Sequence, residues 1–367
     1  MKALRFVIAI CVAVMPVLVS AQSTQRLTAS KANEYGLIYT LPKTGIAITV
    51  EAQKTVKTPG EFYQYAKKYL NMTPILEPSV QWELTGAEIG RYAIADEDEQ
   101  YLTRFKSGQG VFMMVTGESF PVSIGDAGYR PEPSPASTLR AVAAPPTILD
   151  SPVAQQAVTE DMLRAQSTAK RAEMAAAKIY ELRQQRNDIL SGQVDNMPSD
   201  GAAMKLVLDN LSLQEQALTA MFVGTTSVST DVKRFNYIPE DTDEDVTRAV
   251  VARLSVIDGI VEADDLSGEP IYVTVKVTHR GELPVNEKGI VKTFPKEGVA
   301  YRIPGTADVS VGYGGRQMAA VSIQVAQYGV VFGLDPGLFT AKKSPAYLHF
   351  DPETGAVLEL GEISAGE

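Results

Sequence analysis

The chain has 367 residues, of which 45% are hydrophobic and one is cysteine, and its net charge at pH 7 is -10. This length is sufficient for a sizeable hydrophobic core, which we expect to be built as two packed units. The acidic charge opposes binding to a phosphate backbone, so we expect no nucleic acid among the partners.

The first 21 residues have the pattern of a secretory leader. Lys2 and Arg5 precede an apolar run over 6–19, and small residues follow up to Ala21. This pattern predicts a signal peptide over 1–21 that is cleaved after Ala21. The apolar run is too short for a membrane anchor, and we expect no transmembrane segment in the rest of the chain.

The single cysteine, Cys11, lies inside this leader. A lipoprotein needs its cysteine at the cleavage point, so we expect no lipid anchor, and the mature chain has no disulfide. We therefore expect an exported protein of the cell envelope, located in the periplasm or associated with the outer membrane or the extracellular space.

Residues 22–125 are predicted to form an N-terminal β region with one helix. Ile46, Ile48 and Val50 alternate with smaller or polar residues, which is typical of a half-buried strand. The apolar run over 111–115 predicts a central strand.

The predicted helix of this region begins at a capping box. Thr58 would be the cap, Pro59 the first helical residue, and Glu61 the residue that reaches back. The apolar and aromatic side chains that follow share one helical face, which predicts packing onto the sheet; stacking on a sugar is the alternative. They are Phe62, Tyr65, Ala66, Tyr69 and Leu70.

Residues 126–151 form a connector rich in proline and alanine. It has no hydrophobic periodicity, so we expect an extended, exposed segment. A segment of this composition has little to bury, and this predicts mobility over 130–144.

Residues 152–223 are predicted to form a long antiparallel helical hairpin. Ser151 would cap the first helix and Pro152 would be its first residue. Both helices carry seam positions at steps of three and four, which is typical of packed helices. The seams are Met162, Ala165, Ala169, Ala172, Ala176 and Ile179 in the first helix, and Met204, Leu208, Leu211, Glu215, Leu218 and Phe222 in the second.

The first seam, continued by the same steps, reaches Arg183 and Arg186. One interpretation is a structural brace, in which the arginines pair with acidic side chains and fix the register of the hairpin. The alternative is an anion site with two free arginines. The candidate partners are Asp188, Asp200, Asp209 and Glu215.

Residues 224–367 are predicted to form a C-terminal β region. Residues 271–278 alternate strictly between apolar and polar side chains, and Val321, Ile323 and Val325 repeat the pattern. The sequence over 312–315 (GYGG) lies between two strand patterns and predicts a hairpin turn, and 351–355 (DPETG) predicts another.

The sequence nominates no catalytic residue and no cofactor. His279 and His349 have no second histidine at metal-ligand spacing, so they are interpreted as ordinary strand residues. Asp241, Asp243 and Asp245 alternate in an acidic run and form a weak calcium candidate, since the run lacks the glycine and distal glutamate of an EF-hand loop.

Five stretches together resemble an uncharacterised family of exported proteins from Bacteroides-type bacteria, known as a domain of unknown function. This resemblance implies an envelope or extracellular setting and no particular activity. The stretches are 39–52 (YTLPKTGIAITVEA), 58–70 (TPGEFYQYAKKYL), 176–193 (AAKIYELRQQRNDILSGQ), 266–275 (LSGEPIYVTV) and 347–360 (YLHFDPETGAVLEL).

The expected fold class is therefore α+β, with two mainly antiparallel β regions flanking the inserted helical hairpin and sharing a sheet. The expected function is a non-enzymatic binding or structural module whose partner is an envelope protein or a glycan. The alternatives are a hydrolase acting on glycan or peptide, with carboxylates from both β regions, and a small-ligand carrier.

Overall fold

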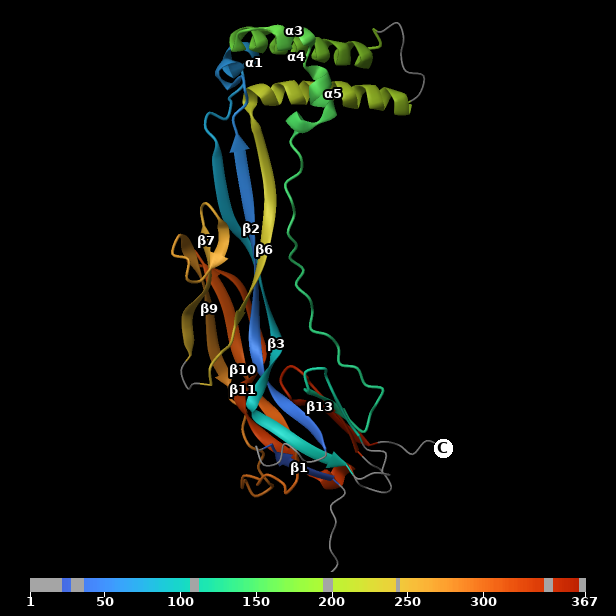
Figure 1. The fold of residues 1–367 in the computed structure, drawn as a ribbon, viewed down its shortest axis with the longest axis vertical. Helices are drawn as coiled ribbons and strands as arrows, with labels where there is room; N and C mark the ends of the chain where they lie inside the picture. The colour runs from blue at the N-terminus through green and yellow to red at the C-terminus, as the bar shows by residue number, and fades with distance from the viewer. Residues whose placement is uncertain are drawn as a thin grey trace, which may run out of the picture.

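The computed structural model describes residues 22–27, 36–105, 112–193, 201–241, 245–339 and 346–362. The molecule is elongated, with helices gathered at one end and most of the strands at the other (Figure 1). We call the helical end the head and the strand-rich end the body. Long strands run between them.

The strands form three antiparallel sheets. The long sheet has the order β1 (Gln22–Arg26), β3 (Ser79–Phe105), β2 (Leu37–Thr58), β6 (Thr225–Tyr237). The five-stranded sheet has the order β11 (Arg316–Leu334), β10 (Val299–Tyr313), β9 (Gly268–His279), β7 (Val246–Ser255), β8 (Gly259–Glu262). The short sheet has the order β13 (Val357–Glu362), β12 (Ala346–Phe350), β5 (Pro121–Ile124), β4 (Met113–Val115).

The predicted α+β class is wrong, because the protein is mainly β. The long sheet contains strands of 22 and 27 residues, β2 and β3. β6, which follows the helices in the sequence, pairs with β2 over Ile46–Thr58. Strands from both halves therefore share a sheet, as expected, but they do not form two β regions on either side of a helical insertion.

The helical elements are mostly short. The α-helices are α1 (Ala66–Leu70), α2 (Pro152–Ala157), α3 (Glu160–Arg164), α4 (Thr168–Leu190) and α5 (Gly201–Val223). The 3-10 helices are η1 (Tyr63–Tyr65), η2 (Ile148–Asp150) and η3 (Pro336–Phe339).

The predicted continuous helix from Ser151 is wrong. The Ser151 cap is confirmed, because its side chain accepts from the backbone N–H of Ala154. However, Thr159 and Ser167 cap two further helices in the same way. Each cap residue has extended backbone angles, so the chain forms three separate helices where one was predicted.

Two further predictions for the N-terminal region need correction. Thr58 belongs to β2, and η1 begins after Phe62 with no side-chain cap, so the capping box is not formed. β4 lies at the edge of the short sheet and is not a central strand. Its neighbour Val111 lies outside the described residues.

The head has a hydrophobic core of its own. Phe62, Ala66 and Leu70 are buried there together with residues of α4 and α5, such as Ile179 and Phe222. The predicted apolar face of the first helix is thus confirmed as a core face, but it packs against other helices and not onto the sheet. Two other cores fill the body, one between the long and five-stranded sheets and one beside the short sheet.

Candidate functional site

Glu215 joins the two longest helices of the head. Arg183 on α4 donates from Nε to Oε1 of Glu215 at 2.6 Å. Arg186, one turn further along, donates from Nη1 to Oε2 at 2.6 Å. The side chain of Glu215 is 14% exposed, and those of the arginines are 35% and 33% exposed. One carboxylate therefore serves two guanidinium groups at a half-buried position.

The other acidic candidates have different partners. Asp188 accepts from the Gln184 side chain at 2.7 Å, and Asp209 pairs with Lys205 at 2.6 Å. Asp200 lies outside the described residues. The structure thus brings together three of the six residues nominated for this site, and the stabilising role of their contact stays a prediction.

The calcium candidates are turned toward neighbours in the protein. Asp241 accepts from the Arg280 guanidinium at 3.2 Å, and Asp245 accepts from the backbone N–H of Val277 at 2.9 Å. Asp243 lies outside the described residues. Among the residues that the structure describes, no group of three His, Cys, Asp or Glu side chains could hold a metal ion.

His349 on β12 lies between two carboxylates. Its Nε2 is 2.9 Å from Oδ2 of Asp126, and its Nδ1 is 3.2 Å from Oε2 of Glu359. The Tyr129 ring stacks on the imidazole with a centroid distance of 3.7 Å. Tyr347 donates its hydroxyl to the other oxygen of Glu359 at 2.7 Å.

Interpreting His349 as an ordinary strand residue missed this cluster. The contact between His349 and Glu359 could have been predicted from the sequence, because the turn predicted over 351–355 places Glu359 opposite His349 on the partner strand. The contact between His349 and Asp126 could not be predicted, since Asp126 lies more than 200 positions earlier. His279, the second histidine, is exposed at the end of β9.

The contact with His349 affects the pKa of the Asp126 carboxyl. The hydrogen bond from the histidine, together with the backbone N–H of Gly128, lowers the pKa of the Asp126 carboxyl. Asp126 is therefore ionised at neutral pH. It stands at the start of the connector, so the cluster attaches this end of the connector to the short sheet.

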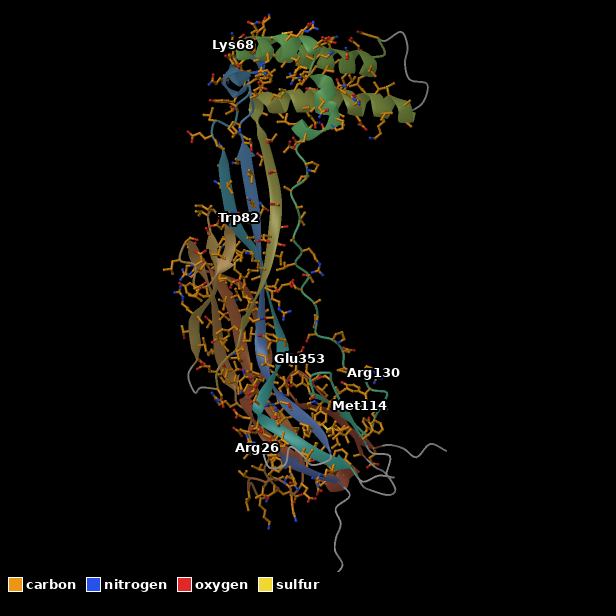
Figure 2. The ribbon with its side chains drawn as sticks, in the orientation of Figure 1. Arg26, Lys68, Trp82, Met114, Arg130 and Glu353 are labelled. Carbon is orange, nitrogen blue, oxygen red and sulfur yellow. The ribbon has the colours of Figure 1, made fainter. Side chains whose placement is uncertain are left out.

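The connector runs from this cluster up to the head along the long sheet (Figure 1). Ser134 donates to Glu353 at 2.5 Å, and the backbone N–H of Thr138 donates to Glu88 at 3.0 Å. Further up, Val142 and Thr230 of β6 exchange two backbone hydrogen bonds of 3.0 and 2.8 Å. Figure 2 shows Arg130 and Glu353 at the lower end of the connector.

A cavity of about 830 Å³ lies between residues 134–138 of the connector and the two larger sheets. Its lining includes small side chains of β2 and β3, such as Ala47 and Ala87. It also includes Arg234, whose guanidinium lies 5.5 Å from the centre of the Tyr92 ring. A second arginine of the lining, Arg91, pairs with Asp351 and Glu353.

A buried ionic cluster connects the sheets beneath the connector. Arg302 on β10 pairs with Asp96 on β3, and the other oxygen of Asp96 is 3.0 Å from Nζ of Lys43. Arg302 and Asp96 are 6% and 4% exposed. Burying charges is costly unless they are paired, and here a cation of the five-stranded sheet and an anion of the long sheet are buried as a pair.

The fold and these contacts define a mainly β protein with a separate helical head. None of the described helices is both long enough and apolar enough to cross a membrane. A family model described as "Domain of unknown function (DUF4831)" matches residues 35–358, so the chain belongs to this family. No curated protein and no solved structure matches the chain significantly.

Proposed function

We propose that this protein is an exported, non-enzymatic structural protein of the cell envelope that bridges partners bound at its head and at its body. The observation that carries this proposal is the separation of the cores. Among the residues that the structure describes, the head core shares no residue with the body cores, and β2, β3, β6 and the connector run between the two ends.

The three strands between head and body have the dimensions of a spacer. β2 and β6 pair continuously from Ile46 to Thr58, and the part beyond Ala52, the last β2 residue of the body core, has six positions. At about 3.3 Å per residue, this part spans roughly 20 Å. The connector provides a second attachment along the same length, and this supports a spacer with a defined orientation of the head.

Support for export comes from the basic, apolar and small-residue pattern over 1–21, which lies outside the described residues. Mass spectrometry of the protein from an envelope fraction tests this part of the proposal. We expect the mature N-terminus at Gln22. A chain that begins at Met1 in that fraction would contradict export.

Bridging is tested by photo-crosslinking in intact cells. A crosslinking amino acid would replace Leu206 on the head or Ile257 on the body, since these side chains are 70% and 76% exposed. We expect adducts from both positions, with a different partner for each end. Adducts from one position alone would contradict a bridge, and the same replacement at buried Leu218 is the matched negative control.

A second function, transport of a small ligand, is favoured by the cavity of about 830 Å³ under the connector. Its lining residue Ala136 is exposed and belongs to the connector, so Ala136→Trp would fill the cavity with little effect on the cores. Native mass spectrometry would show a retained ligand in the wild type and none in the variant. If the wild type carries no ligand, the transport function is contradicted and the structural function remains as the only proposal.

A further inference from the structure

The outer face of the five-stranded sheet has a hollow with two arginines. Its volume is about 270 Å³, and its lining includes Arg248 on β7, Tyr272 on β9 and Arg316 on β11. The inner face of the same strands carries core residues such as Val273 and Val311, so the hollow lies on the side away from the core.

Arg248 is held in an unusual backbone conformation. Its φ angle is 57°, and it lies where the pairing of β7 with β9 shifts register between Val246 and Ala249. A left-handed conformation at a residue other than glycine costs on the order of 1 kcal/mol or more, and such strain concentrates at functional sites. Here the bulge places the guanidinium 4.3 Å from the centre of the Tyr272 ring.

Arg316 is positioned by the hairpin turn predicted over 312–315, which is confirmed. Tyr313 and Arg316 pair across the two-residue loop of Gly314 and Gly315. Both glycines have positive φ, at 55° and 76°, as a tight turn of this kind requires. The turn therefore directs a second cation toward the same hollow.

Neither arginine has a carboxylate within salt-bridge distance among the described residues, whereas Arg183, Arg186 and Arg302 all do. Glu269, the carboxylate of this region, accepts a hydrogen bond from Tyr313. Burial and this bond raise the pKa of Tyr313 to about 12, so its hydroxyl stays protonated. Two arginines without an ion-pair partner among the described residues therefore line one hollow of a chain whose net charge is -10.

Polar, uncharged groups surround the two cations. Thr274, Ser310 and Gln317 line this hollow and also an adjoining one of about 470 Å³. In the adjoining hollow, Lys276 and Asp308 stand opposite each other on paired strands, so their charges balance. The hollow with the two arginines thus continues into a longer surface of hydroxyl, amide and small apolar groups, the last including Ala320 and Val321.

We propose that this face binds an acidic saccharide, with Arg248 and Arg316 holding its carboxylate. Arginine donates to a carboxylate through two parallel N–H groups, and stacking on Tyr272 leaves the edge of the Arg248 guanidinium free for such a contact. The hydroxyl and amide groups of the adjoining hollow match the hydroxyl groups of neighbouring sugar rings.

The test is isothermal titration calorimetry at low salt with three probes: tetragalacturonate, neutral maltotetraose and inorganic phosphate. We expect binding of tetragalacturonate and none of maltotetraose. Arg248→Gln and Arg316→Gln each remove charge-assisted hydrogen bonds, so each should weaken binding roughly ten- to hundredfold. Tyr272→Leu removes the stacking surface without a change of charge and should weaken binding less.

Arg164→Gln is the matched control, because Arg164 is exposed on α3 in the head and the substitution changes the charge equally. It should leave the affinity unchanged. Arg316 is exposed at the first position of β11, so its variant keeps the test valid even if Arg248→Gln fails to fold. Three outcomes would each overturn the proposal. They are binding of maltotetraose as tight as that of tetragalacturonate, unchanged affinity of both arginine variants for tetragalacturonate, and binding of phosphate as tight as that of tetragalacturonate.

Discussion

Glu215 on α5 pairs with two arginines of α4, and its predicted role as a brace can be tested by substitution. Glu215→Ala leaves both Arg183 and Arg186 without their carboxylate at a half-buried position. The loss should lie between that of an exposed and a buried pair, at about 1–3 kcal/mol of unfolding free energy. Urea unfolding followed by circular dichroism measures it.

Asp209→Ala is the matched control for this substitution. Its pair with Lys205 lies on the exposed surface of α5, with side chains 56% and 76% exposed. Such a pair contributes about 0.2–0.5 kcal/mol. A Glu215→Ala variant as stable as Asp209→Ala, together with stabilisation of the wild type by sulfate, would favour an anion site instead of a brace.

His349 should make stability depend on acid pH through Asp126. The pKa of Asp126 is lowered in the folded protein, mainly by the hydrogen bond from His349. The lowered pKa stabilises the folded protein. This stabilisation is fully present above about pH 3.9, the ordinary pKa of Asp in an unfolded chain, and it is lost as the pH falls through the lower pKa of Asp126 in the folded protein. His349→Phe keeps a ring to stack on Tyr129 but removes the hydrogen bond.

We expect two results for His349→Phe. The pKa of Asp126 should rise toward its ordinary value, as measured by carboxyl-carbon NMR. The difference in melting temperature between wild type and variant should be larger at pH 5 than at pH 2.5. A difference that is independent of pH would show that the packing of the imidazole matters and its hydrogen bond does not.

Single residues were predictable from the sequence where a local spacing determined them. The steps of three and four along α4 led to Arg183 and Arg186, and both contact the neighbouring helix. Their partner was harder to predict. Whether Glu215 lies beside these arginines depends on how far α5 is shifted along its axis relative to α4, and the sequence does not give this shift. The same limit applies to Asp126 and His349, which only the assembled sheets bring together.

At the scale of an element, the connector is a segment for which the prediction from composition and the contacts in the structure disagree. Its composition predicts mobility, yet it makes side-chain and backbone contacts at Ser134, Thr138 and Val142. Trypsin cleavage after the exposed Arg140 distinguishes the two descriptions. If the connector is held in place, the wild type should be cut slowly there.

Val142→Pro should release this part of the connector. Proline has no N–H to donate to Thr230, and the side chain of Val142 is 58% exposed, so little packing is lost. We expect cleavage after Arg140 to accelerate several-fold, while Val142→Thr, which keeps the N–H, should behave like the wild type. Rapid cleavage of the wild type itself would establish mobility.

Elements with local signals were predictable, and their extent was not. The alternation over 271–278 matches β9, and the turn at 312–315 joins β10 to β11. The lengths of β2 and β3 depend on each other, because their pairing extends from Leu37 to Lys57. Similarly, the sequence pattern did not show where the chain leaves the helical conformation before Thr159 and Ser167, which cap α3 and α4.

At the scale of the whole molecule, the elongated shape has a measurable consequence. A compact protein of this length would have a radius of gyration of about 21 Å. Small-angle X-ray scattering should therefore give a clearly larger value at infinite dilution. A value near 21 Å would mean that the head folds back onto the body, and this would contradict the spacer proposal.

The fold class could not be predicted because it depends on pairing between distant strands. β6 follows α5 in the sequence but joins β2, and β12 joins β5 across more than 200 positions. Local periodicity identifies a strand without indicating its partner. The helical pattern over 152–223 was clear by comparison, which gave the helices too much weight in the predicted class.

The direction of the long strands also determines how the molecule bears mechanical load. β2, β3 and β6 run along the axis that joins head and body (Figure 1). A force that pulls the two ends apart acts along these strands, and because each strand is continuous from head to body, their covalent backbones carry the load in parallel. The two antiparallel bonds between Val142 and Thr230 add the connector to the same load-bearing section. We therefore expect the protein to resist a force along its length better than a force across its strands.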